Sequence, residues 1–299
     1  MWWLLAVISA LFLGIYDVVK KVSLNNNAVL PVLLFSSLSG AILFVPLWIA
    51  SQIHAIPSHH LFFIPSITPK EHAMLFLKSM IVVTSWIFSF FALKHLPLTI
   101  VSPIRATGPL WTLVGAIIIF SERLSTYQWI GIIITLAFFY MFSIAGKTEG
   151  ISFRRNKWIL FLILGTLFGA VSGLYDKFLL RHINRMAVQC YFTFYQVILF
   201  APLVMIIWWP TRKKTSAFIW RWSIPLIGFF LIVADFFYFY ALHIPESMIS
   251  IVSALRRASV IVAFAFGAYL FKEKNIQTKA IYLVGILIGI ALLIFGTNQ

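Results

Sequence analysis

Long apolar runs dominate the chain, and short polar connections separate them. A helix that crosses a bilayer needs about 20 consecutive, mainly apolar residues, and runs of this length recur along the whole sequence. Prolines, asparagines and charged residues gather between the runs, as in KKVSLNNN, SERLS and WPTRKKTS. The pattern predicts ten membrane-spanning helices, over residues 2–22, 29–52, 73–93, 98–120, 126–145, 158–180, 187–209, 223–242, 246–270 and 277–296.

A pattern of small residues in the first predicted span returns in the sixth. Each of these spans carries three Ala or Gly residues four positions apart, followed by a Tyr-Asp pair. Small residues at this spacing let a neighbouring helix approach closely. The third and eighth spans also match, as SWIFSFFAL and ADFFYFYAL. The series in the first and sixth spans are Ala6, Ala10, Gly14, Tyr16 and Asp17, and Gly165, Gly169, Gly173, Tyr175 and Asp176.

These matches indicate that the first five spans repeat as the last five. Because five is an odd number, the second copy must lie inverted in the membrane. We therefore predict an all-α polytopic membrane protein with ten transmembrane helices in two inverted five-helix repeats. The repeats cover residues 1–147 and 158–299, and a basic linker joins them at 148–157. Inverted repeats with a site between them near the bilayer midplane are common among transporters.

The composition excludes several other classes of protein. Of the 299 residues, 62% are hydrophobic and only 10% are charged, which is too apolar for a soluble domain of this size. The formal net charge is +15, but the basic residues lie mostly in short connections, where they orient the chain and meet anionic lipid headgroups. We expect no nucleic-acid partner. Cys190 is the single cysteine, which excludes an intrachain disulfide, and we expect no metal or cofactor.

Three arginines lie inside predicted spans and are the first candidates for a binding site. They are Arg105 in the fourth span and the adjacent pair Arg256 and Arg257 in the ninth. A charged side chain at bilayer depth faces a cavity or a partner. One interpretation is that these guanidinium groups hold a carboxylate or phosphate of a substrate. The other is that aspartates neutralise them and the pairs lock helices together.

Three aspartates inside spans are candidates for proton coupling. Asp235 lies in the middle of the eighth span with no basic residue within a turn, so any partner must come from another helix. Asp17 precedes Lys20 by three residues, a spacing that predicts an ion pair within the helix. Asp176 adjoins Lys177, an arrangement that places the two side chains poorly for pairing. The alternative role for Asp17 and Asp176 is charge pairing near a helix end.

Aromatic residues of the third and eighth spans could stack on a substrate, with Trp86 and Tyr238 as the candidates. The alternative is that they pack helices together. Glu122 and Glu273 each stand beside a basic residue at a predicted helix end, so we interpret them as interface or capping residues. The pair Gly108-Pro109 predicts a kink in the fourth span.

One series of residues occurs twice: an aromatic residue with Ala-Leu, a proline, an apolar helix, a Glu with a basic residue, and a glycine in the next helix. The first copy is Phe91-Ala92-Leu93, Pro97, Pro109, Glu122-Arg123 and Gly131. The second copy is Tyr240-Ala241-Leu242, Pro245, Glu273-Lys274 and Gly285, with Val260 at the place of the helix proline. With this repeated series the chain resembles the EamA family of the drug/metabolite transporter superfamily.

The resemblance implies a transporter, and the substrates of the family are too varied to be carried over. We expect a secondary transporter that moves a small anionic or zwitterionic metabolite by alternating access, with protons as a candidate coupling ion. The alternative is a flippase for a lipid or a lipid-linked sugar phosphate. The sequence has no HExxH, GxSxG or phosphate-binding loop, so we expect neither an enzyme nor an ATP-driven pump. A monomer and a homodimer both stay open.

The distribution of Lys and Arg predicts the orientation in the plasma membrane, which we expect to be a bacterial inner membrane. Connections that are rich in these residues stay cytoplasmic. The connections after odd-numbered spans carry fourteen of them, and the side of both termini carries five at most. We predict that both termini face away from the cytoplasm, although the resemblance implies cytoplasmic termini. The fourteen are Lys20, Lys21, Lys94, Lys147, Arg154, Arg155, Lys157, Arg212, Lys213, Lys214, Arg221, Lys272, Lys274 and Lys279.

Overall fold

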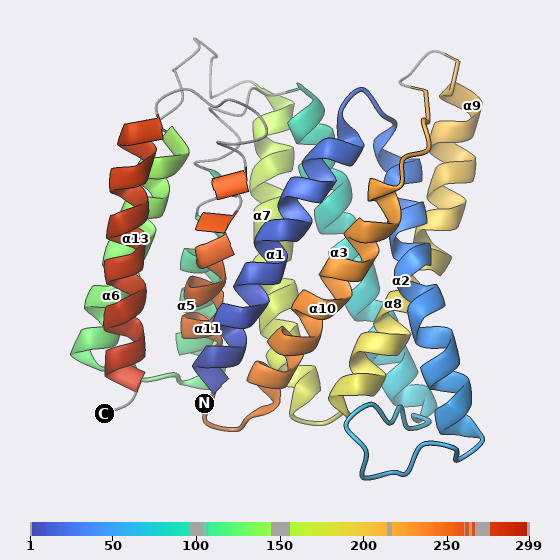
Figure 1. Ribbon diagram of the computed structural model, residues 1–299, viewed down its shortest axis with the longest axis horizontal. Helices are drawn as coiled ribbons and strands as arrows, with labels where there is room; N and C mark the ends of the chain where they lie inside the picture. The colour runs from blue at the N-terminus through green and yellow to red at the C-terminus, as the bar shows by residue number, and fades with distance from the viewer. Residues whose placement is uncertain are drawn as a thin grey trace.

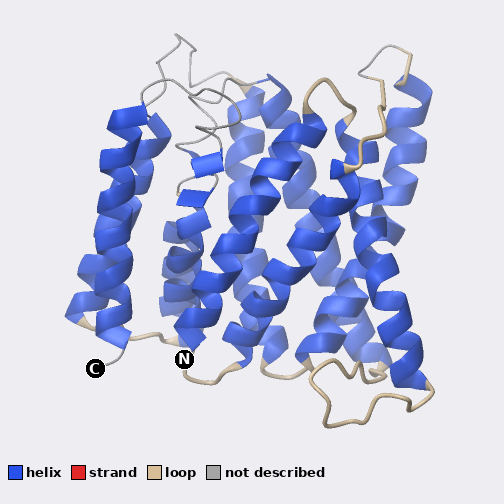
Figure 2. Ribbon diagram, viewed as in Figure 1, coloured by secondary structure: helices blue, strands red, loops and turns tan. Residues whose placement is uncertain are grey.

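The computed structural model describes residues 2–95, 104–105, 107–144, 156–213, 217–259, 261–262, 265–266 and 276–297. Within these ranges every regular element is a helix, and no strand occurs (Figure 2). Seven helical segments are long and apolar enough to cross a membrane. They belong to α1 (Trp2–Leu24), α2 (Val29–Gln52), α3 (Pro69–His95), α7 (Lys157–Leu180), α8 to α9 (Arg185–Thr211), α10 (Ser223–His243) and α13 (Ile276–Thr297).

The remaining described helices are not among these seven segments. Two of them are apolar, α5 (Gly108–Phe120) and α6 (Thr126–Ile144), and of these α6 agrees with the predicted span 126–145. Pro109 lies in the first turn of α5, where its missing N–H leaves no hydrogen bond unmade. Gly108-Pro109 therefore begins α5 shortly after the helical residues 104–105, so the helix is interrupted at the place where we predicted a kink. Residues 96–103 of the expected fourth span lie outside the described residues.

The expected ninth span, 246–270, is not one uniform helix. Its first part is α11 (Ile249–Leu255), and Arg256–Ala258 then forms a 3₁₀ turn (η3). A 3₁₀ turn is tighter than an α-turn and often marks a functional hinge. The tighter turn falls at the two arginines that the sequence places at bilayer depth. Residues 267–275, which include Glu273, lie outside the described residues.

The helices pack in pairs that join the first half of the chain to the second (Figure 1). Helix α1 lies against α10, and α3 lies against α7; α2 packs on α8, and α6 on α13. Small residues permit close approach, as the repeated Ala/Gly series predicts: Ala6 and Ala10 are fully buried. A Cβ added at Gly165 would lie 2.5 Å from Ser89 Oγ on α3, which leaves no room for a side chain there.

The helix ends gather at two edges of the bundle. Both termini lie at one of them, which we call the terminus edge (Figure 1). At the opposite edge, α1 ends where α10 begins, and the hydroxyls of Ser23 and Ser223 lie 2.6 Å apart. There α3 also ends where α7 begins, and the ring of His95 stacks on that of Trp158 at 3.7 Å. Helices α1 and α10 therefore run antiparallel, as do α3 and α7.

Candidate functional site

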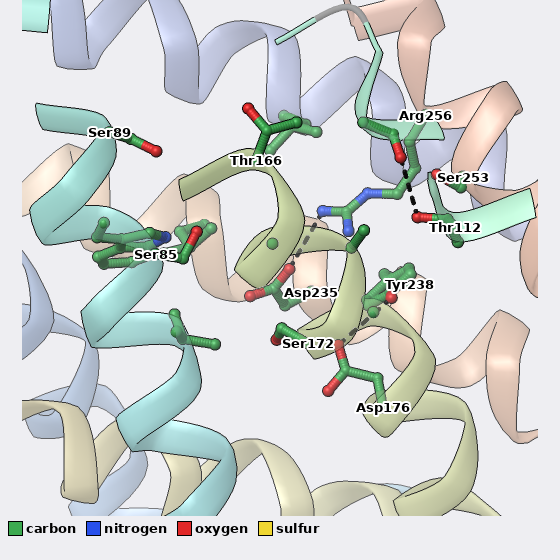
Figure 3. A pocket seen from close by; sticks show the side chains of 18 of the residues that line it. Ser85, Ser89, Thr112, Thr166, Ser172, Asp176, Asp235, Tyr238, Ser253 and Arg256 are labelled. Carbon is green, nitrogen blue, oxygen red and sulfur yellow. Dashed lines mark hydrogen bonds and ion pairs between the residues drawn. The ribbon is translucent and has the colours of Figure 1, made fainter. Parts of the chain in front are cut away.

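A cavity of about 350 Å³ lies between the two halves of the chain. Helices α1, α3, α5, α7, α8, α10 and α11 and the turn η3 all contribute residues to its wall, many of them polar (Figure 3). Every residue that the sequence suggests for binding or proton coupling lies on this wall. These residues are Asp17, Trp86, Arg105, Asp176, Asp235, Tyr238, Arg256 and Arg257.

Asp176 pairs with a lysine that the sequence analysis did not select. Lys78 of α3 forms an ion pair with Asp176 Oδ1 on α7, and the two residues are only 1% and 5% exposed. The Lys78 ammonium also lies 4.0 Å from the ring centroid of Phe192. Lys78 therefore does not extend toward the membrane surface. Its position on α3 directs it to α7 across the tight α3–α7 contact.

Asp235 has its partner on another helical segment, as the sequence predicts. Arg256 Nη2 of η3 donates to Asp235 Oδ1 of α10 at 3.3 Å (Figure 3). The Arg256 guanidinium also lies 4.1 Å from the ring centroid of Tyr238. Arg256 Nε is buried and makes no hydrogen bond in the described part of the chain. The residue itself lines the cavity.

Tyr238 links the two ion pairs. Its hydroxyl donates to Asp176 Oδ2 at 3.3 Å, while its ring lies against Arg256 (Figure 3). A continuous series of contacts therefore runs from Lys78 through Asp176, Tyr238 and Arg256 to Asp235. The tyrosine contacts the charged groups themselves, which is more specific than the stacking that its aromatic pattern suggests. Trp86 also lies on the wall, and its ring stacks on Phe200.

The remaining candidates lie around this series. Asp17 and Lys20 form the predicted pair within α1, with 3.4 Å between Oδ1 and Nζ. Arg257 Nε donates to the carbonyl of Ser253 at 3.4 Å. Arg105 is exposed on the cavity wall. The cavity thus combines several basic groups with hydroxyls from α5, α7 and α11, an environment suited to a polar or anionic solute.

Two charged residues bind the α10–α11 corner, where α10 ends at His243 and α11 begins at Ile249, at the terminus edge. Glu122 accepts hydrogen bonds from the amides of Ile249, at 2.7 Å, and Ser250, and from the Ser250 hydroxyl. Glu122 is therefore a cap, as the sequence suggests, but of a helix far along the chain. Lys177, only 1% exposed, donates to the Ser247 hydroxyl at 2.5 Å and to two carbonyls of the same corner.

Comparison with known proteins identifies the family. The EamA-like transporter family matches residues 1–144 and 156–295, which is nearly the whole chain in two copies. The chain belongs to the EamA-like transporter family. It is an integral membrane protein of the drug/metabolite transporter type, as the paired motifs predict.

A crystal structure supports the fold. It matches with a TM-score of 0.73 and 15% sequence identity, over 98% of this chain and 98% of the other. At this identity the likeness concerns the fold alone. None of the curated proteins matches the chain.

The buried pair of Lys78 and Asp176 gives a first prediction. Lys78→Met should lower the free energy of unfolding by about 3–5 kcal/mol, because it leaves a buried carboxylate without its cation. Adding Asp176→Leu should recover much of this loss, since it removes the uncompensated charge. Thermal unfolding of the two single variants and the double variant in detergent measures the coupling. If the loss in the double variant equals the sum of the losses in the two single variants, the two side chains do not form a buried pair.

Proposed function

We propose that this protein is a secondary transporter that moves a small anionic or zwitterionic metabolite by alternating access. The observation that supports this proposal most directly is the charged cavity between two copies of the EamA repeat. Charged side chains at membrane depth usually mark a substrate or ion pathway. The cavity brings arginines, aspartates and hydroxyls from both halves together in one wall.

We further propose that ten transmembrane helices form two inverted repeats. Support comes from the contacts between helices. In the two repeats α1, α2, α3, α5 and α6 correspond to α7, α8, α10, α11 and α13, and the same contacts recur when each helix is replaced by its counterpart. The contact of α1 with α10 becomes that of α7 with α3, and the contact of α2 with α10 becomes that of α8 with α3. The pairs α2–α8, α6–α13 and α5–α11 map onto themselves. Such exchange is expected for two copies related by a twofold axis in the membrane plane.

The two edges of the bundle differ in a way that supports alternating access. The cavity wall runs from Ile249, at the start of α11, up to Lys20 and Thr166, which lie toward the opposite edge. Below it, at the terminus edge, Glu122 and Lys177 hold the α10–α11 corner. We propose that this conformation is the one open toward the opposite edge. To open the terminus edge, the transport cycle must then break the hydrogen bonds of Glu122 and Lys177.

A flippase for a lipid headgroup is the alternative on this fold. A lipid would require the cavity to continue sideways into the bilayer. Arginines, aspartates and hydroxyls line the cavity, and this polar lining favours a small solute that enters from water. We therefore place a water-soluble metabolite first.

The transport proposal predicts uptake that depends on Asp235. Proteoliposomes with the wild-type protein should accumulate at least one of a panel of anionic and zwitterionic metabolites when a pH gradient is imposed. Asp235→Asn should abolish accumulation driven by the gradient yet keep downhill exchange, because an amide cannot bind and release a proton. Asp17→Asn and Asp176→Asn test the other two proton-coupling candidates in the same way.

The control is Arg212→Gln, since Arg212 lies on Trp209 at the end of α9, outside the cavity. This variant should transport as the wild type does. Accumulation by Asp235→Asn at the wild-type level would remove Asp235 from proton coupling. Failure of the wild type to move any member of the panel would contradict the transport proposal.

The orientation gives a separate prediction. We propose that both termini face away from the cytoplasm, because the connections at the opposite edge hold most of the Lys and Arg residues. A reporter that is active only outside the cytoplasm, fused after Gln299, should therefore be active. A reporter that works only in the cytoplasm should be silent at the same position. The reverse pair of results would show that the termini follow the expectation from the family.

A further inference from the structure

The charges on the cavity wall do not balance. Three carboxylates lie on the wall, and each one has a basic partner: Asp17 with Lys20, Asp176 with Lys78, and Asp235 with Arg256. Among the described residues, the wall carries five basic side chains, which exceed the three carboxylates by two positive charges. These two charges belong to Arg105 and Arg257.

The described acidic residues outside the cavity do not neutralise this surplus. Glu122 caps α11 at the terminus edge, and Glu71 binds the amide and hydroxyl of Thr68. Glu246 is exposed on the α10–α11 corner. Within the described ranges, Arg257 contacts the Ser253 carbonyl and the Phe139 ring, and neither of these groups carries a charge.

A surplus of two guanidinium groups inside a membrane protein is costly unless water or an anion compensates it. The charges of Arg256 and Arg105 repel that of Arg257, while Asp17, which is paired with Lys20, attracts it more weakly. The remaining repulsion increases the benefit of a counter-anion. A guanidinium group binds carboxylate or phosphate oxygens through two parallel hydrogen bonds.

We propose that the cavity takes a doubly charged organic anion, either a phosphate monoester or a dicarboxylate, in preference to a monoanion or a zwitterion. This inference rests on the proposed transport function and narrows its substrate class. The dianion would neutralise Arg105 and Arg257 and leave the three internal ion pairs intact. The hydroxyl of Ser253 on the same wall could donate to one of its oxygens, whereas those of Thr112 and Thr166 donate to the carbonyls of Gly108 and Leu162.

The test measures binding without transport. Thermal unfolding and calorimetric titration of the purified full chain in detergent use four probes: glycerol 3-phosphate, succinate, lactate and alanine. The measurements are made above pH 7, where a phosphate monoester carries a charge of about −2. We expect a dianion to bind about ten- to hundredfold more tightly than lactate or alanine, as the loss of one charge-assisted contact implies. Comparison of glycerol 3-phosphate with succinate distinguishes the two sources of a dianion.

Charge-changing variants test whether the two surplus positive charges cause the preference for a dianion. Arg257→Gln and Arg105→Gln each reduce the surplus to one positive charge, so each should lose about tenfold or more in dianion affinity while lactate binding is retained. Arg257→Lys keeps the charge and should keep most of the preference. Arg212→Gln lies outside the cavity and should bind as the wild type does. Because the two arginines come from different helices, either variant alone suffices if the other does not fold.

The outcomes separate this inference from the transport proposal. Tight binding of a dianion without uptake in proteoliposomes would contradict the transport proposal and leave the inference standing. Uptake of alanine or lactate with no binding of either dianion would overturn the inference and leave transport standing. Equal affinity for dianions and monoanions, or a preference that Arg105→Gln and Arg257→Gln do not change, would also overturn it.

Discussion

A charged side chain within a bilayer needs a partner or water, and this constraint organises the centre of the molecule. The pair of Lys78 and Asp176 joins α3 to α7, and the pair of Arg256 and Asp235 joins η3 to α10. Tyr238 connects the two pairs through its hydroxyl and its ring. Four helical segments from both halves are thus held by one set of polar contacts around the cavity.

The same contacts explain why the cavity can be both stable and functional. A buried ion pair contributes little net stability, but removing one partner is strongly destabilising. The two pairs therefore fix which helices adjoin without filling the space between them. The anchors at the terminus edge act differently, because Glu122 and Lys177 bind backbone groups and hydroxyls of one corner. Hydrogen bonds of this kind can break and re-form with water when that edge opens.

Much of the fold and many residues of the site could be predicted from the sequence, because each signal lies within a short stretch of the chain. Apolar runs of membrane length, the Ala/Gly series and the twice-occurring EamA motif led to an all-helical membrane protein with two related halves. Charged residues inside apolar runs are rare, so Arg105, Asp235 and Arg256 stood out without any knowledge of contacts. The absence of a basic neighbour around Asp235 correctly placed its partner on another element.

What the sequence did not reveal depends on contacts between distant residues. Lys78 and Asp176 are 98 positions apart, and the position of Lys78 in its span fits a surface lysine equally well. The 3₁₀ turn at Arg256–Ala258 has no distinct residue pattern, since the same letters continue an α-helix. Glu122 could be identified as a cap, but the capped helix, α11, lies 127 residues away.

The central claim is that the charged groups surround a water-filled cavity, and thiol labelling tests it most directly. The experiment compares Thr166→Cys on the cavity wall with Ile198→Cys on the outer face of α8. Both are made in a Cys190→Ala background, so that the introduced cysteine is the single thiol of the chain. A membrane-impermeant thiol reagent should modify Thr166→Cys and leave Ile198→Cys unmodified, because lipid covers the latter. Protection of Thr166→Cys from reagent on both sides of the membrane would contradict the account.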